Sequence, residues 1–404
     1  MPSSPQRLMP YLEGLFTMPA TCLEPSLLGK TDAISETAQA MKRLSADIGW
    51  HYDLTLTFNY ASLTPSTHGM KSDFVSTNNE FWGTWTLAKS ADDKQGIFVM
   101  MEADWGEGFG YNQNTQGVQQ SLGSQSNPVS ATRGGDGVFI PHLSLGYSGW
   151  DGKFVAMAGT LDTSNFFDQN RYSANWSGNL LNLSFNYNPC LPMPWSNWGY
   201  MTAWQPHDHF YALYATTGSN APIGHNPFHY ISDDYWVHLA ELGYVNEDVM
   251  GWGPGTYRFI YTFTRESKKD GVGAAVNVEQ QLGKNNPLGF FLRAGYMDDD
   301  AALVSGVKSA VTCGFVLDAP FTQSGWGSQD NNDQLALGLL WQRAAEAEQA
   351  LEHRDEYGVE LSAVIQLTPT FFIQPDVQYI FNPIYAKDGR SGAFVFQVET
   401  SFRF

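Results

Sequence analysis

Apolar and polar residues alternate along much of the chain with a period of two. In the last twelve residues, Phe394, Phe396 and Phe402 fall on one face of the pattern, and Glu399 and Arg403 fall on the other. Because successive side chains of a β-strand point to opposite sides, this segment predicts a strand with one oily and one polar face. In a soluble sheet the oily face is buried, whereas in a membrane barrel it faces lipid and the polar face lines the lumen.

The same alternation recurs along the chain and predicts about sixteen strands. Their predicted ranges are 51–60, 80–88, 96–104, 139–148, 153–161, 199–205, 210–216, 235–245, 256–264, 272–282, 288–297, 310–317, 335–342, 357–367, 371–380 and 393–404. A tilted strand of about ten residues is long enough to cross a bilayer, and an even number of strands suits a closed barrel. We therefore predict an all-β fold, a transmembrane antiparallel β-barrel, with eighteen strands as an alternative count.

The connections between the predicted strands alternate in length. Residues 149–152 and 368–370 form short connections after even-numbered strands, while 105–138 and 162–198 form long ones after odd-numbered strands. Short turns at one end and long loops at the other distinguish the periplasmic and extracellular ends of outer-membrane barrels. The long connection 318–334 is an exception to this pattern.

The N-terminal region has a different pattern. Residues 1–30 are rich in proline and predict an extended tail or a partial plug, and Ser35–Ala46 has the spacing of one short helix. We therefore divide the chain into a tail with a helix, residues 1–46, and a barrel domain, residues 47–404. Because Leu8–Ala20 is interrupted by proline, glutamate and glycine, it is not a convincing signal peptide, and we expect the sequence to be a mature or engineered form.

Composition supports a barrel in a membrane. Of the 404 residues, 43% are hydrophobic, 14% are aromatic and only 16% are charged; a soluble domain usually has about a quarter charged residues. No continuous apolar run is long enough for a membrane-spanning helix. A soluble sandwich is less consistent with strands whose oily faces are so aromatic, because Tyr and Trp suit the two membrane interfaces.

The net charge of −19 restricts the partners. Nucleic acid is excluded as an expected partner, because phosphate binding requires a basic face. The charge is consistent with acidic extracellular loops or with a pore that tolerates cations.

The connection after the fifth strand contains the best candidates for solute contact. In sixteen-stranded porins the third extracellular loop folds into the barrel and narrows it. Flat aromatic rings and amides suit an uncharged polyol, and charged groups add oriented hydrogen bonds; the alternative is that the loop needs these residues only for its turns and for anchoring. The candidate constriction residues are Asp162, Asp168, Arg171, Trp176, Asn179, Trp195 and Trp198.

A second group of candidates consists of charged residues on the predicted lumen faces. A charged side chain facing lipid is costly near the midplane of the bilayer, so the alternation assigns these residues to the interior. They predict a pore wall formed by Glu102, Asp104, Arg258, Arg293, Glu360, Asp376, Glu399 and Arg403.

Other chemistry is weakly indicated. The nine histidines offer no local arrangement with a nucleophile or paired acids, so we expect no enzyme, no cofactor and no metal site. His207–His209 falls in a short turn, and 297–300 and 330–333 lack the full ligand spacing of a calcium loop. Three cysteines are present, and if a disulfide forms, Cys22 with Cys190 is the expected pair.

Three segments of the chain resemble the carbohydrate-selective porin family of Gram-negative outer membranes. They are Gln374-Pro-Asp-Val-Gln-Tyr379 followed by Asn382-Pro383, the segment 158–168, and the acidic segment 356–361. The final aromatic residue also resembles the terminal signal by which outer-membrane barrels are recognised for assembly. The resemblance implies a sixteen-stranded diffusion channel that usually passes glucose and related sugars. The chain departs from the family pattern after Asn-Pro, where Ile384 and Tyr385 replace paired glycines.

These observations predict a passive, substrate-selective channel for sugars or similar small polar solutes in the Gram-negative outer membrane. The alternatives are a general or cation-preferring porin, and a non-conducting barrel with a structural or surface role. The expected partners are small-molecule solutes, with sugars first, and outer-membrane lipid and lipopolysaccharide. A monomer and a homotrimer are equally consistent with the sequence.

Overall fold

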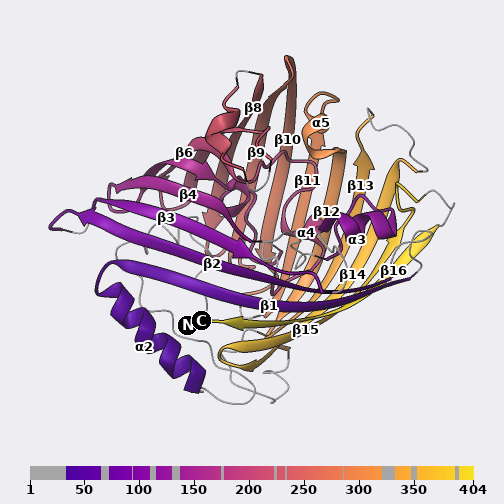
Figure 1. Cartoon of the computed structure of the whole chain (residues 1–404), viewed down its shortest axis with the longest axis horizontal. Helices are drawn as coiled ribbons and strands as arrows, with labels where there is room; N and C mark the ends of the chain where they lie inside the picture. Colours follow the sequence, from indigo (N-terminus) through magenta and orange to yellow (C-terminus); the bar gives the residue numbers. More distant parts are fainter. Residues whose placement is uncertain are drawn as a thin grey trace.

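Antiparallel strands close into a single barrel in the computed structural model (Figure 1). The structure describes residues 33–64, 72–92, 94–109, 115–129, 137–173, 177–222, 225–232, 234–284, 286–320, 333–346, 353–386 and 391–404. Within these residues there are sixteen strands, each paired with its neighbours in the sequence, and β1 pairs with β16 to close the sheet. The predicted fold class is therefore confirmed.

The strands differ in length, and short helices lie in the connections. The strands are β1 (Trp50–Thr64), β2 (Asp73–Lys89), β3 (Gly96–Trp105), β4 (Val138–Gly149), β5 (Phe154–Leu161), β6 (Asn197–His207), β7 (Phe210–Gly218), β8 (Tyr235–Asn246), β9 (Gly255–Glu266), β10 (Lys269–Gln281), β11 (Leu288–Met297), β12 (Val307–Asp318), β13 (Gln334–Ala344), β14 (Asp355–Thr368), β15 (Phe371–Phe381) and β16 (Gly392–Arg403). The helices are α2 (Ala33–Ala46), α3 (Thr115–Leu122), α4 (Leu183–Asn186) and α5 (Ala302–Ser305), with 3₁₀ turns η1 (Thr163–Asn165) and η2 (Pro227–Tyr230).

Every predicted strand coincides with an observed one, and the largest difference is at β2. This strand begins at Asp73, not at Glu80. Its first residues pair with the C-terminal half of β1, where Ser62 lies opposite Asp73. Ser76 and Asn78 face inward while Thr77 faces outward, so polar residues on both faces concealed the alternation there. The closing pair joins β1 to the terminal strand, with Tyr60 opposite Val398.

The two ends of the barrel differ as predicted. Connections after even-numbered strands, such as 150–153 and 208–209, are short, and we call this the short-turn end. The opposite, long-loop end carries loop L2, residues 106–137, and loop L3, residues 162–196. The hairpin between β9 and β10 is an exception at the long-loop end, because Ser267 and Lys268 both have positive φ and form a tight two-residue turn. The long connection 318–334 lies largely outside the described residues.

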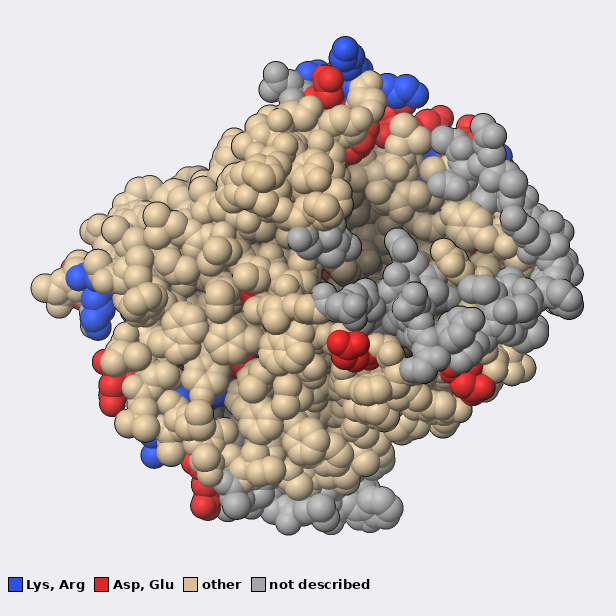
Figure 2. All heavy atoms as spheres, viewed as in Figure 1, with Lys and Arg blue, Asp and Glu red and all other residues tan. Residues whose placement is uncertain are grey.

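The outer face of the barrel is apolar. Outward-facing residues that are more than a third exposed include Phe58, Tyr60, Leu145, Tyr200, Leu242, Phe259, Leu339, Leu361 and Phe396. Figure 2 shows that most of the surface on this side carries no charge and that Lys, Arg, Asp and Glu gather mainly toward its edges. Among the described residues, no helix has the length and apolarity needed to cross a membrane.

The inner face is not uniformly polar. On one side of the barrel, Phe98, Met100, Val155 and Met157 face inward and pack with Phe167 of loop L3 in a buried apolar cluster. This differs from the expectation that the lumen face is mostly polar or charged. The reason is that the loop covers these side chains with protein instead of water, so this part of the interior is a packed core.

Loop L2 fills another part of the interior. Its helix α3 places Val118 and Leu122 against Leu63, Ile380 and Val395, all of them buried. These three contacts come from the long-loop ends of β1, β15 and β16, so α3 is folded into the mouth of the barrel beside the closing strand pair.

Candidate functional site: an infolded loop and a pocket at the barrel mouth

Loop L3 leaves β5 through a local cap. The Asp162 carboxylate accepts hydrogen bonds from the Ser164 backbone N–H at 2.9 Å and from the Ser164 hydroxyl at 2.6 Å, which closes the 3₁₀ turn η1. The Asp162 N–H in turn donates to Nδ1 of the buried His142 at 3.4 Å. Asn165, at the end of η1, donates from Nδ2 to Glu102 Oε2 at 2.7 Å. The turn therefore directs the loop inward, across the inner faces of β3 and β4.

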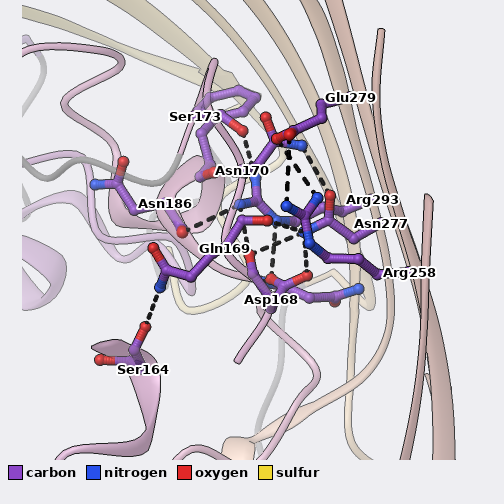
Figure 3. Close-up of polar contacts among 12 residues, drawn as sticks. Ser164, Asp168, Gln169, Asn170, Ser173, Asn186, Arg258, Asn277, Glu279 and Arg293 are labelled. Carbon is purple, nitrogen blue, oxygen red and sulfur yellow. Dashed lines mark hydrogen bonds and ion pairs between the residues drawn. The ribbon is translucent and has the colours of Figure 1, made fainter. Parts of the chain in front are cut away.

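Asp168 and Arg293 form the centre of the loop's attachment to the wall (Figure 3). Both side chains are fully buried, and Arg293 Nε donates to Asp168 Oδ2 at 2.8 Å while Nη2 donates to the Asp168 carbonyl oxygen at 2.9 Å. Asp168 also accepts hydrogen bonds from Asn277 Nδ2 at 2.7 Å and from the Asn188 N–H at 2.6 Å. Burial raises the pKa of Asp168, and the Arg293 guanidinium opposes that shift.

Arg293 also binds the far side of the loop. Its Nη1 donates to the Phe185 carbonyl oxygen at 2.6 Å and to the Ser173 hydroxyl, and Nη2 reaches the Asn186 carbonyl oxygen at 3.3 Å. One guanidinium thus joins three stretches of loop L3 that are separated in sequence. Because the charge is completely buried, it depends on all of these partners for compensation.

Two wall carboxylates bind the backbone of the loop next to this centre. Glu241 on β8 accepts from the Asp168 N–H at 2.8 Å, and Glu279 on β10 accepts from the Arg171 N–H at 2.6 Å. Arg258 on β9 lies between the two acids, 3.7 Å from Glu241 and 3.4 Å from Glu279 (Figure 3 shows Arg258 and Glu279). Loop backbone groups that face the wall therefore meet fixed acceptors, as buried N–H groups require.

The middle of loop L3, residues 177–182, is held by strands β13, β14 and β16. Glu360 on β14 accepts hydrogen bonds from the backbone N–H groups of Leu181 and Asn182, the latter at 3.2 Å. Glu399 on β16 accepts from the Ser177 hydroxyl at 2.6 Å. Asn179 donates from Nδ2 to Gln334 at 2.8 Å. The loop is consequently attached on both sides of the barrel interior.

Glycines on the wall make room for the loop. A Cβ at Gly338 would lie 2.8 Å from the Phe185 ring, and a Cβ at Gly295 would lie 2.4 Å from Cys190 Sγ. Both distances are shorter than any real carbon contact, so these positions require glycine for close approach. The infolding of loop L3 is therefore encoded in the wall as well as in the loop.

The predicted constriction residues have different positions. Asp162, Asp168 and Asn179 anchor the loop, and Arg171 adds an ion pair with Asp318 at 3.1 Å. The three predicted tryptophans do not lie with these anchors. Trp195 lines a pocket described below, and Trp176 lies outside the described residues. Trp198 is one of the outward-facing residues of β6 and packs edge-to-face on Trp236. Trp198 is therefore placed away from the interior, because the strand begins at Asn197 and Asn197 takes the inward position.

The predicted wall residues all face inward, but loop L3 covers most of them. Glu102, Asp104, Arg258, Arg293, Glu360, Asp376 and Glu399 are at most 4% exposed. Asp376 accepts hydrogen bonds from Gln378 at 2.8 Å and Gln397 at 2.9 Å, and Arg403 donates to the Ser177 carbonyl oxygen and lies over the Phe372 ring. Glu102, Arg293, Glu360, Glu399 and Arg403 bond directly to loop L3.

One carboxylate cluster includes Glu102, the acceptor for Asn165 of loop L3. Glu80, Glu102 and Asp104 bring one oxygen each within 4.8 Å of the others. Cys190 is a buried free thiol, and Cys22, its predicted partner, lies outside the described residues, as does the tail 1–30.

A pocket of about 370 Å³ opens between the loops at the long-loop end. Parts of loops L2 and L3, the connections after β7 and β11, and β13 line it, and the described lining residues include Gln119, Gln125, Asn127, Ser184, Tyr187, Trp195, Asn197, Ser219, Ser305 and Gln342. None of the described lining residues is charged. Burial raises the pKa of Tyr187 to about 12, so its phenol stays neutral at physiological pH.

Two residues that line this pocket carry a buried acceptor oxygen without a donor. Asn127 Oδ1 and Gln342 Oε1 are buried and have no hydrogen-bond partner among the described residues. Gln342 is fixed in place because its Nε2 donates to Glu356 Oε1 at 2.9 Å. Buried acceptors without donors are costly, so a group that donates a hydrogen bond to either oxygen would stabilise this region.

Sequence reasoning missed part of this site. Glu241 and Glu279 occupy inward positions of predicted strands, so the alternation contained the signal for them. Asn127 and Gln342 gave no such signal, because their meeting depends on the fold of loop L2. Nor could the glycine positions be interpreted before the loop's path was known.

One comparison with known proteins shows the family, and another shows the fold. A family model described as carbohydrate-selective porin, OprB family, matches residues 107–404. The high-pH structure of Pseudomonas putida OprB is 15% identical, covers 94% of this chain and 99% of its own, and superposes with a TM-score of 0.71. Its low-pH structure, also 15% identical, covers 94% of this chain and 99% of its own with a TM-score of 0.55.

The structure of a triple mutant of the Rhodopseudomonas blastica porin is 10% identical to this chain. The match covers 88% of this chain and 100% of the porin chain, with a TM-score of 0.55. At such low identity the solved structures show the shared barrel fold. No curated protein sequence matches the chain. The family match and the fold together indicate a Gram-negative outer-membrane channel for small solutes. The resemblance noted in the sequence is confirmed: the chain belongs to the OprB family of carbohydrate-selective porins.

Proposed function

We propose that this outer-membrane channel passes neutral sugars, or small polar solutes with a similar array of hydroxyl groups, by passive diffusion. Loop L3 and the pocket at the mouth act as its filter. The observation that carries the proposal is that a chain with a net charge of −19 contains a pocket whose described lining has no charged residue and includes two residues, Asn127 and Gln342, with an unpaired acceptor oxygen. A general pore has no need of such a site.

The pocket suits a sugar in size and chemistry. Its volume of about 370 Å³ lies in the range of small-molecule sites. Asn127 and Gln342 offer acceptors to sugar hydroxyls, while Gln119 and Gln125 add amides that donate as well as accept. Trp195 supplies an aromatic ring of the kind that covers the apolar face of a pyranose.

Planar-bilayer recordings test this proposal. The intact channel should conduct ions, and added glucose or maltose should reduce the current in a saturable manner. Asn127→Leu and Trp195→Ala should each weaken the sugar block by about threefold to tenfold, which corresponds to one lost hydrogen bond or ring contact. The ion current without sugar should change little.

Matched controls lie at the opposite end of the barrel. Asn246→Leu and Trp252→Ala make the same chemical changes near the short turn between β8 and β9, where Trp252 is 59% exposed, and should leave the block unchanged. A channel that conducts but is not blocked by sugar would be a general or cation-preferring porin. A barrel that does not conduct would have a structural or surface role. Either result overturns the proposal.

A further inference from the structure

Helix α2 exposes an apolar stripe next to the barrel. Ile34, Met41 and Leu44 on the helix are 47%, 57% and 70% exposed, and Ile48 in the turn after it is 72% exposed. Ile34, Met41 and Ile48 follow one another at intervals of seven residues, and Leu44 is three residues from Met41. At 3.6 residues per turn these side chains lie along one side of the helix.

The other sides of α2 have different surroundings. Ser35, Ala38 and Lys42 are at most 6% exposed and form the packed side. Glu36 and Arg43 are exposed and lie away from both the packed side and the apolar stripe. The helix thus has a packed side, a charged side and an apolar side that no described residue covers.

Lys42 fixes the orientation of the helix relative to the barrel. Its ammonium group bonds to Asp53 Oδ1 at 2.6 Å and lies over the Tyr52 ring, 5.9 Å from the centroid. Tyr52 and Asp53 are adjacent residues near the start of β1, at the short-turn end. Figure 1 shows α2 outside the sheet, beside the beginning of β1.

The apolar stripe is continuous with the lipid-facing surface of the barrel. The Ile48 carbonyl oxygen accepts a hydrogen bond from Trp85 Nε1 at 3.3 Å, and Trp85 itself is 47% exposed on the outer face of β2. Trp50 packs edge-to-face on Trp85 at 6.4 Å and stacks on Phe81 at 6.0 Å. Aromatic groups of this kind mark the membrane interface of a barrel.

We propose that α2 is an interfacial helix that lies in the periplasmic leaflet of the outer membrane. Ile34, Met41, Leu44 and Ile48 are immersed among the acyl chains, Glu36 and Arg43 face the water and headgroups, and the Lys42–Asp53 ion pair holds the helix at the rim. An amphipathic helix beside an aromatic belt has the features of such a lipid-bound element. This proposal does not depend on which solute the channel passes.

Site-directed nitroxide labels test the position of the helix. Labels are placed at Met41→Cys and Leu44→Cys on the stripe, and at Glu36→Cys and Arg43→Cys as matched controls on the charged side. The full chain is reconstituted in vesicles of phosphatidylethanolamine and phosphatidylglycerol, and unsubstituted protein treated with the same reagent gives the background from its own cysteines. Relaxation by oxygen, which concentrates in lipid, is compared with relaxation by a water-soluble nickel complex.

The stripe labels should show an oxygen-to-nickel ratio several-fold higher than the labels at positions 36 and 43. Using two positions on each side guards against a single label that displaces the helix. Equal access of the nickel complex to all four labels would place the helix in water and overturn the proposal. Dipolar broadening at positions 41 and 44 that disappears when labelled protein is diluted with unlabelled protein would show that a second copy covers the stripe, which would also overturn it.

Discussion

Arg293 bonds to four residues of loop L3, and we expect the position of the loop to depend on it. Arg293→Met removes the guanidinium and leaves the Asp168 carboxylate buried without its ion-pair partner. Breaking a buried pair from one side costs about 3–5 kcal/mol, so we expect loop L3 to detach before the barrel unfolds. In a urea titration, protease cleavage within residues 162–196 reports detachment of loop L3, and this cleavage should begin at a lower urea concentration than in the unsubstituted protein. Single-channel conductance should rise.

A control and a rescue make the test of Arg293 specific. Arg265→Met breaks an exposed ion pair with Asp270 and should cost about 1 kcal/mol or less. The double variant Arg293→Met with Asp168→Leu removes both charges and should recover part of the lost stability, because no uncompensated charge is left. If Arg293→Met left both the loop cleavage and the conductance unchanged, the pair would not anchor the loop.

The glycine at 338 gives a second prediction at the scale of one residue. Gly338→Ala would place a Cβ 2.8 Å from the buried Phe185 ring, so the loop must move or the strand must shift, and overpacking of this kind typically costs about 1–3 kcal/mol. Gly358→Ala is the matched control on β14, because there the nearest atom, Leu340 Cβ, is 3.4 Å away. Protease access to loop L3 should increase in the first variant only, and equal behaviour of the two variants would contradict the predicted contact.

At the scale of elements, Glu356 on β14 joins loop L2 to the wall. Its carboxylate accepts hydrogen bonds from the Ser124 hydroxyl at 2.9 Å and from the backbone N–H groups of Gln125 at 3.0 Å and Ser126 at 2.9 Å. It also accepts from the side chain of Gln342, which lines the mouth pocket, at 2.9 Å. One buried carboxylate therefore fixes the loop and one wall of the pocket together.

We expect Glu356→Ala to loosen loop L2 and to weaken sugar block at the same time. Each buried donor left without an acceptor costs about 1–3 kcal/mol, and Glu356→Ala leaves several. Protease cleavage within residues 106–137 and the sugar dependence of the current measure the two effects. Glu346→Ala is the control, because that carboxylate is 58% exposed and binds only Lys308 among the described residues. A change in cleavage without a change in block would separate loop L2 from the filter.

The strands could be predicted from the sequence because their physics is local. A strand with lipid on one side needs an unbroken outward apolar set, and Tyr357 to Leu361 shows that set without reference to any other part of the chain. The helix α2 was predicted within two residues of its start for a similar reason. The early start of β2 was missed because Thr77 is polar on the outward face.

The interior was harder to predict because its contacts join residues far apart in the chain. The predicted inward direction of Glu360 was correct, but its bonding to the backbone at Leu181 and Asn182 depends on the path of a long irregular loop. The inward position of the apolar residues Phe98 and Met100 is likewise explained only by Phe167 of loop L3, which covers them. Alternation gives the direction of a wall side chain, and the loops decide whether that side chain meets solute or protein.

For the molecule as a whole, net charge is a poor guide to solute chemistry. Acidic residues at Glu241, Glu279, Glu360 and Glu399 accept hydrogen bonds from loop L3 or pair with Arg258, so they are used inside the protein. The described lining of the mouth pocket has no charge. A strongly acidic channel can therefore have an uncharged pocket at its mouth.

This separation of charge and filter predicts different responses to pH. Between about pH 5 and 9 no neutral amide, hydroxyl or indole of the pocket titrates. Tyr187 does not titrate there either, because its pKa is raised to about 12 and it loses its proton only above that value. The sugar concentration that halves the current should therefore stay constant over this range.

Ion selectivity should shift away from cations as the pH falls toward 4, since exposed carboxylates at the rim then gain protons and lose negative charge. Reversal potentials in a salt gradient and sugar titrations on the same channels measure the two quantities. If the sugar affinity instead followed a titration curve with a midpoint between about pH 5 and 7, an ionisable group would control sugar binding, and a neutral pocket that works independently of the charged loop anchors would be contradicted.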